Sequence, residues 1–168
     1  MNTTTLPQTT NGTRPAGFPA QVIRFLLKGP GQLKSRPLGW AIGLLALAGA
    51  ALLVWSSVIH LMLWSDGYSG ISVIGPLFLI QGAGSIVLAV VLAVFRRVVL
   101  LAAGAVTMAA TAAGLLLSVG VSRFGFRESL AVPYAMSSLV VEFAGAALLA
   151  AAAALVLASR PGPRPVRR

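Results

Sequence analysis

The residue best able to do chemistry in this chain is Glu142, a single carboxylate within the apolar run 134–158. A run of about 20 apolar residues is long enough to cross a lipid bilayer, so Glu142 is expected to lie inside a membrane. Ionisable residues placed there are energetically costly, and they commonly mark proton or ion pathways. Glu142 is therefore the first candidate for a functional site.

Few other residues can carry chemistry, since the chain has three acidic residues, one His and no Cys. The lack of Cys excludes disulfides and thiolate chemistry. One His and three scattered acids do not make a ligand set for a metal ion. No paired nucleophile and base and no phosphate-binding glycine loop occur in the sequence, so we predict no cofactor, no metal site and no enzymatic activity.

The elements that must position Glu142 are four apolar runs. Of the 168 residues, 57% are hydrophobic and 10% are charged, whereas about a quarter of the residues in soluble domains are charged. Each run is long enough to cross a bilayer, and the short connections favour antiparallel neighbours. The sequence predicts an all-α polytopic membrane protein, an up-down four-helix bundle over 38–158 with helices at 38–64, 71–95, 98–121 and 134–158.

Lys and Arg are distributed unevenly around these runs. Eleven of the thirteen lie in the two terminal tails and the second turn, and only Arg123 and Arg127 lie on the other side. The positive-inside rule then places both termini in the cytoplasm. Because the basic residues flank apolar runs, we expect them to contact anionic lipid headgroups and not nucleic acid. With its high Arg, Ala and Gly content, the chain is predicted to be a multi-pass protein of a bacterial plasma membrane.

The terminal segments differ in character from the bundle. Residues 1–17 are polar and lack periodicity, which predicts a disordered cytoplasmic tail, and 159–168 form a basic cytoplasmic tail. Residues 18–37 form either a spacer or an amphipathic helix on the inner leaflet. We favour the helix, because four large apolar residues fall near one helical face: Phe18, Val22, Phe25 and Leu26.

Small residues recur at helical spacing in each run, and such stripes allow close helix packing in lipid. The expected stripes are Gly39, Gly43, Ala46, Ala50, Ser57 and His60 in the first run; Gln81, Ser85, Ala89 and Ala93 in the second; Ala103, Thr107, Thr111, Gly114 and Ser118 in the third; and Glu142 with Gly145 in the fourth, beside a ridge of Ala146, Ala150 and Ala154.

Four polar members of these stripes lie in the outer half of the predicted bundle. Measured from the outer ends of the runs at about 1.5 Å per residue, His60 lies ~6 Å deep, Glu142 ~12 Å, and Gln81 and Thr111 ~15 Å. The inner half of the runs is almost purely aliphatic and Ala-rich. We therefore predict a polar cluster in the outer half of the bundle, made of His60, Gln81, Thr111 and Glu142.

Two interpretations of Glu142 remain open. In the first, a protonated carboxyl donates a hydrogen bond to Gln81 or Thr111 and fixes the helix register. In the second, Glu142 is a proton-titrating or cation-binding site, with His60 as the best candidate counter-group and Arg123 and Arg127 of the outer loop as rivals. His60 could instead be satisfied by water or by Ser56 one turn earlier. Pro76 is expected to kink the second helix.

Part of the sequence resembles a known kind of protein. Residues 60–68, HLMLWSDGY, continuing to 74–81, IGPLFLIQ, are similar to small four-helix integral membrane proteins common in actinobacteria, as are 124–128, FGFRE, and the acid at Glu142. The resemblance implies the four-helix fold and an actinobacterial host, and it implies no activity. It also groups His60, Gln81 and Glu142 into one constellation.

Two functions follow as expectations. The first is a non-enzymatic membrane subunit or scaffold that packs against a partner membrane protein or a second copy of itself, with the polar cluster as interhelical glue. The alternative is a small-solute or proton-coupled carrier that uses Glu142 as its titrating group. Since four helices make a thin wall around a pathway, such a carrier is expected to be oligomeric.

Overall fold

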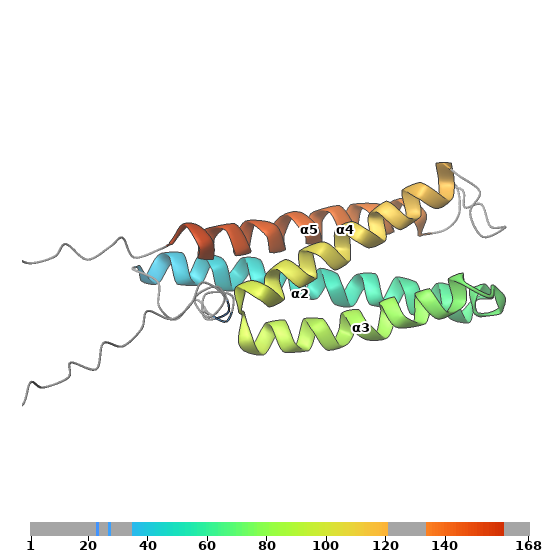
Figure 1. Ribbon diagram of the computed structural model, residues 1–168, viewed down its shortest axis with the longest axis horizontal. Helices are drawn as coiled ribbons and strands as arrows, with labels where there is room; N and C mark the ends of the chain where they lie inside the picture. Colours follow the sequence, from blue (N-terminus) through green and yellow to red (C-terminus); the bar gives the residue numbers. More distant parts are fainter. Residues whose placement is uncertain (1–22, 24–26, 28–34, 121–133, 160–168) are drawn as a thin grey trace, which may run out of the picture.

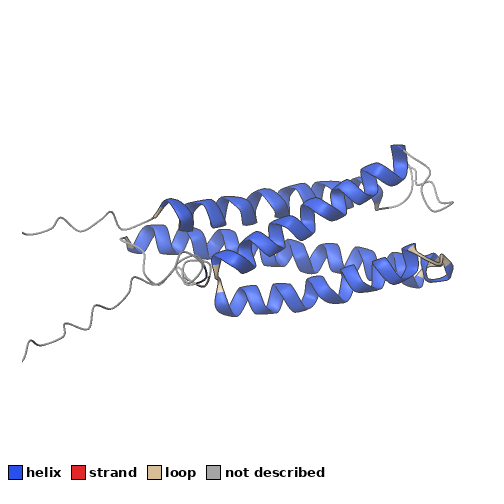
Figure 2. Cartoon of the chain, viewed as in Figure 1, coloured by secondary structure: helices blue, strands red, loops and turns tan. Residues whose placement is uncertain are grey.

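The computed structural model describes residues 23, 27, 35–120 and 134–159 (Figure 1). These residues form four α-helices and one 3-10 turn, with no strand among them (Figure 2). All four helices are long and apolar enough to cross a membrane, which confirms the predicted all-α four-helix membrane fold. The elements are α2 (Arg36–Ser65), η2 (Tyr68–Gly70), α3 (Ile74–Phe95), α4 (Val98–Gly120) and α5 (Ala135–Ala158).

The predicted terminal segments fall mostly outside this description. The amphipathic helix expected over 18–37 and the tails at 1–17 and 159–168 lie outside the described residues, apart from Ile23, Leu27, Ser159 and residues 35–37, of which Arg36 and Pro37 belong to α2. Ile23 and Leu27 are described, and the Leu27 amide donates a hydrogen bond of 3.0 Å to the Ile23 carbonyl. Nη1 of Arg97, in the turn between α3 and α4, donates a hydrogen bond of 2.5 Å to the Leu27 carbonyl.

The second helix begins later than its apolar run. The run was predicted from residue 71, but η2 precedes the helix and α3 starts at Ile74. Gly75 allows this tight approach, because an added Cβ there would lie 2.6 Å from the Ser69 carbonyl oxygen. Pro76 is the third residue of α3, where a helix has no intrahelical acceptor for the missing N–H. The expected mid-helix kink was therefore wrong, and Pro76 stands at the helix start.

Helices α2 and α5 form the centre of the packing. α2 packs most extensively against α3 and α5, and α4 packs mainly against α5. α3 and α4 follow each other in the chain through Arg96 and Arg97, where Arg96 adopts a left-handed conformation with φ 42°. They contact each other much less, and Figure 1 shows them diverging away from this turn.

Glycines shape the apolar half of the bundle. The buried side chain of Leu149 on α5 occupies space left by two glycines, because an added Cβ would lie 2.5 Å from its Cδ2 at Gly49 and 2.8 Å from its Cδ1 at Gly104. At Gly145 an added Cβ would meet the end of the Met108 side chain. Large side chains set into glycine gaps therefore join α5 to both α2 and α4.

The small-residue stripes predict the packed face in α2 and not in α4. Gly43, Ala46, Ala50, Ser57 and His60 are all buried. In α4, however, Ala103 and Gly114 are exposed, while the buried residues are Val98, Leu101, Gly104, Met108 and Ala112. The ridge of Ala150 and Ala154 in α5 is likewise exposed. Alanine and glycine occur on every side of α4 and α5, so their spacing does not select a face, and the large residues do.

Candidate functional site

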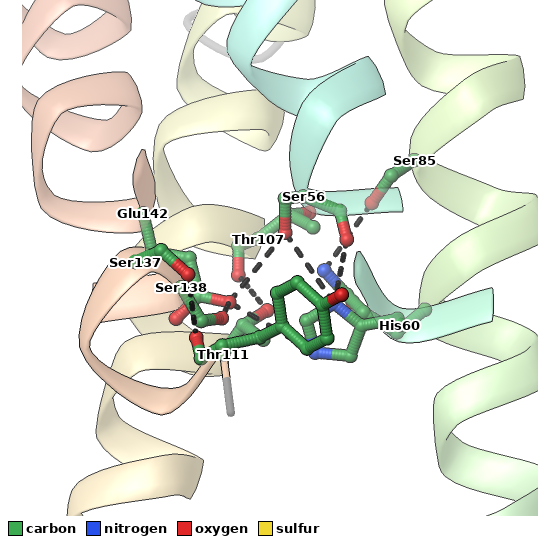
Figure 3. Close-up of polar contacts among 10 residues, drawn as sticks. Ser56, His60, Ser85, Thr107, Thr111, Ser137, Ser138 and Glu142 are labelled. Carbon is green, nitrogen blue, oxygen red and sulfur yellow. Dashed lines mark hydrogen bonds and ion pairs between the residues drawn. The ribbon is translucent and has the colours of Figure 1, made fainter. Parts of the chain in front are cut away.

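Two matching pairs of residues form the centre of the polar site. α2 carries Ser56 and His60, and α5 carries Ser138 and Glu142. In each pair the serine precedes the ionisable residue by four positions, which places both on one helix face. Since α2 and α5 pack side by side, the two pairs face each other, as Figure 3 shows.

Glu142 is sealed within the protein, with 0% of its surface exposed. Its Oε1 atom accepts a hydrogen bond of 2.9 Å from the Ser138 hydroxyl and one of 3.5 Å from the Ser56 hydroxyl (Figure 3). Its Oε2 atom is buried and has no hydrogen-bond partner among the described residues. Donors from both helices thus bind one oxygen of the carboxyl, whereas the other oxygen is buried without a donor among the described residues, which is unusual for a buried polar atom.

His60 is also buried, with 5% of its surface exposed. Its Nδ1 lies 2.8 Å from the Ser56 carbonyl oxygen. Because a carbonyl only accepts, Nδ1 carries a proton and donates it. The other ring nitrogen, Nε2, lies 3.9 Å from Oε1 of Glu142. Ser56 therefore connects the two groups, through its carbonyl to His60 and through its hydroxyl to Glu142.

An aromatic stack covers His60 from the end of the bundle that carries η2. The Phe78 ring meets the imidazole edge-on, with ring centroids 5.1 Å apart and an interplanar angle of 77°. The Tyr68 ring stacks on Phe78 at 5.2 Å and 15°. Aromatic pairs favour both arrangements, so this stack fixes the position of His60 beneath it.

A second polar contact joins α2 to α3 one turn from the site. The Ser57 hydroxyl, which is buried, donates a hydrogen bond of 2.5 Å to the Gly82 carbonyl. Gly82 permits this approach, because a Cβ there would lie 2.6 Å from Cγ of Leu61. α2 thus makes interhelical hydrogen bonds on two sides, to α3 through Ser57 and to α5 through Ser56.

The structure brings two of the four predicted residues together. His60 and Glu142 face each other across α2 and α5. The amide of Gln81 instead donates a hydrogen bond of 3.2 Å to the Ser85 hydroxyl in α3, and the Thr111 hydroxyl donates one of 2.8 Å to the Thr107 carbonyl in α4. Each of these bonds stays within one helix, which satisfies a polar group in lipid without a partner helix.

The expected hydrogen bond from Glu142 to Gln81 or Thr111 is therefore replaced by others. Ser138 and Ser56 supply the partners of the carboxyl. Ser138 did not stand out in the sequence, because it lies in a short helical turn with Ser137 at the start of α5. The available signal was its spacing of four residues before the only acid of the run.

The chemistry open to this set is narrow. One carboxyl, one imidazole and two serine hydroxyls can exchange protons and form hydrogen bonds between helices. No group of three or more His, Cys, Asp or Glu residues able to hold a metal ion occurs in the described part of the chain. The arrangement is thus a proton-bearing hydrogen-bond network that joins α2 to α5.

Comparison with known proteins finds no family model, curated protein or solved structure that matches the chain. The fold and the site define a membrane protein with four helices long enough to span the bilayer and a buried carboxyl–imidazole pair. The resemblance to actinobacterial four-helix proteins stays a prediction.

Proposed function

We propose that this chain is a non-enzymatic membrane subunit or scaffold, in which the Glu142 network holds α2 against α5. The observation that carries the proposal is the full burial of the Glu142 carboxyl, with serine donors from both helices on the same oxygen. In lipid, interhelical hydrogen bonds and close packing replace the hydrophobic effect as the forces between helices. A buried, hydrogen-bonded contact between two helices is typical of a structural role.

The surfaces of α4 and α5 support a role in association. Both helices expose small residues to their surroundings, and small residues allow a neighbouring helix to approach closely. The exposed positions are Ala109, Ala110, Ala113 and Gly114 on α4, and Ala147, Ala150, Ala151 and Ala154 on α5. A partner membrane helix or a second copy of the chain would pack on these faces.

The same proposal places the chain in a bacterial plasma membrane with both termini in the cytoplasm. The first residue of α2, Arg36, lies at the same end of the bundle as the turn that carries Arg96 and Arg97 (Figure 1). Basic residues gathered at one end of a membrane bundle favour the cytoplasmic side and contact with anionic headgroups.

Proteoliposomes separate this role from that of a proton-coupled carrier. The purified protein is reconstituted, a pH gradient is imposed, and internal pH is followed with a trapped dye for the native chain and for Glu142→Gln. We expect both to match protein-free liposomes, because Glu142 is closed off from water. Proton flux in the native protein that disappears in Glu142→Gln would overturn the proposal and establish the carrier.

Association is tested on the exposed ridge of α4. Ala110→Leu and Ala113→Leu add bulk on this face, and Val87→Leu on exposed α3 is the matched control. After extraction into native lipid nanodiscs, we expect the native chain and the control to run as an assembly larger than one copy, and the two ridge variants to run smaller. A native chain that is monomeric and free of partner proteins would contradict the scaffold role.

A further inference from the structure

We propose that Glu142 and His60 together form a binding site for a single proton, which is carried either by the carboxyl of Glu142 or by Nε2 of His60. The site goes beyond the scaffold role, because a joint needs only hydrogen bonds and no exchangeable ligand. It is built by α2 and α5 and lies under the Phe78 ring.

The geometry of His60 fixes which nitrogen faces the acid. Nδ1 donates its proton to the Ser56 carbonyl at 2.8 Å. In a neutral imidazole one nitrogen donates and the other accepts, so Nε2 is then an acceptor. It faces Oε1 of Glu142 at 3.9 Å, and a carboxylate oxygen also only accepts. Two unprotonated acceptors that face each other in a buried site repel, so one of the two groups is expected to carry a proton.

One proton leaves the pair electrically neutral in either of its two arrangements. The proton sits on Glu142, giving a carboxylic acid beside a neutral imidazole, or on His60, giving a carboxylate beside an imidazolium; moving it breaks one O–H bond and forms one N–H bond. Removing it leaves a net negative charge, and adding a second leaves a net positive one. Both are costly in a buried, low-dielectric site.

No other charged group on the packed helices can compensate such a charge. α3 and α4 contain no Asp, Glu, Lys, Arg or His, and Glu142 is the only such residue in α5. On α2 the other one is Arg36, about 36 Å away along the helix at 1.5 Å per residue. Asp66 is exposed beyond the end of α2, and the Tyr68 ring stacks on Phe78. Among the described residues of the packed helices, the two partners are therefore the groups that titrate as a unit.

The size of the site selects a proton over a larger ligand. Glu142 has 0% exposure and its Oε2 atom is fully enclosed. A sodium or calcium ion would need about six oxygen ligands around it, whereas the site offers one carboxyl and two hydroxyls. A proton needs one lone pair and no added volume, and either the carboxyl of Glu142 or Nε2 of His60 provides that lone pair.

Magnetic resonance can test this site directly, because His60 is the only His of the chain. The full-length protein, labelled with ¹⁵N-His and ¹³C-carboxyl Glu, is placed in lipid nanodiscs and measured from about pH 5 to about pH 8, where an ordinary imidazole titrates. Glu128→Gln removes the only other glutamate and leaves one Glu signal.

The expected result is complementary protonation of the two groups at every pH. Nδ1 stays protonated, and the pair is either acid with neutral imidazole or carboxylate with imidazolium. A carboxylate beside a neutral imidazole, an acid beside an imidazolium, or a neutral imidazole protonated on Nε2 would overturn the proposal. This measurement uses the site residues unaltered, so it is independent of how variants fold.

Substitutions then isolate this proton. Glu142→Gln removes the acid that balances the charge of an imidazolium, so His60 is expected to stay a neutral imidazole throughout this pH range. Ser137→Ala keeps both titrating groups and both serine donors of Glu142 and is the matched control, because the exposed Ser137 hydroxyl bonds the Tyr134 carbonyl, so it is expected to retain the native Nε2 signal. An imidazolium at His60 in Glu142→Gln within this pH range would overturn the proposal. The proton-flux experiment is separate, so the site can hold its proton whether or not the scaffold role fails.

Discussion

The two halves of the bundle hold their helices together by different means. Around Leu149, contact depends on shape, because its side chain occupies the space beside Gly49 and Gly104. Around Glu142, contact depends on hydrogen bonds from Ser56 and Ser138. In lipid, close packing supplies many small contacts, whereas a single buried hydrogen bond contributes about 0.6 kcal/mol on average. The comparison suggests that shape stabilises the bundle and that the polar pair fixes which faces meet.

The largest expected effect comes from removing one large side chain in the apolar half of the bundle. Leu149→Ala deletes a fully buried side chain at the junction of α2, α4 and α5. We expect the free energy of unfolding to fall by about 2–5 kcal/mol, the cost of a cavity at such a position. Chemical unfolding in mixed micelles measures it, with Leu44→Ala on the exposed face of α2 as the control. Equal losses for the two variants would refute the packing role of Leu149.

Filling a glycine gap tests the same half from the other side. At Gly49 an added methyl would lie 2.5 Å from Cγ of Leu149, a branch point that cannot swing away alone. Gly49→Ala is therefore expected to lower the free energy of unfolding by about 1–3 kcal/mol, as overpacking does. Gly84→Ala is the matched control, since nothing lies within 4 Å of its added methyl. A Gly49→Ala protein as stable as Gly84→Ala would contradict the claim that the space beside Gly49 is needed for the packing of Leu149.

The polar half is expected to respond less. Glu142→Gln keeps the shape of the side chain and an acceptor for the two serines but removes the acid. We expect a loss of about 1 kcal/mol, within the range of ~0.6–1.7 kcal/mol found for polar contacts between membrane helices. The same unfolding titration measures it. Stability equal to the native protein would mean that the carboxyl does not act as interhelical glue.

The smallest effect is expected at the start of α5. Ser138→Ala removes the shorter hydrogen bond to Glu142 and leaves the bond from Ser56 in place. We expect a loss of about 0.6 kcal/mol. Ser137→Ala is the control, because the Ser137 hydroxyl bonds the Tyr134 carbonyl within its own turn and is exposed. A larger loss for Ser137→Ala than for Ser138→Ala would contradict the assignment of Ser138 as the stabilising partner of Glu142.

The sequence was sufficient to predict the fold and the packed faces of two helices, α2 and α3, where Ser85 and Ala89 are buried. Four apolar runs predicted four helices, and the small residues of α2 from Gly43 to His60 predicted its packed side. The same reasoning failed in α4, where Ala103 and Gly114 are exposed while Met108 is buried. A helix that is alanine-rich all around has no small-residue face to distinguish. Its orientation follows from where large side chains find glycine gaps on neighbours, such as Met108 beside Gly145.

The site was predictable in the same partial way. Depth from the ends of the runs placed His60 and Glu142 in the same outer half of the bundle, and the structure places them 3.9 Å apart. Depth alone also included Gln81 and Thr111, because it does not report rotation about a helix axis. Their hydrogen bonds fall within their own helices. The missing partner, Ser138, is found by asking which hydroxyl lies one turn before a buried acid.

A double-mutant cycle between α2 and α5 tests the central claim, that the polar pair couples these two helices. The free energy of unfolding is measured for the native chain, His60→Gln, Glu142→Gln and the double variant. We predict that the two losses are not additive, with a coupling of about 0.6–1.7 kcal/mol. Additivity within about 0.3 kcal/mol would show that the residues act independently, and it would contradict the claim.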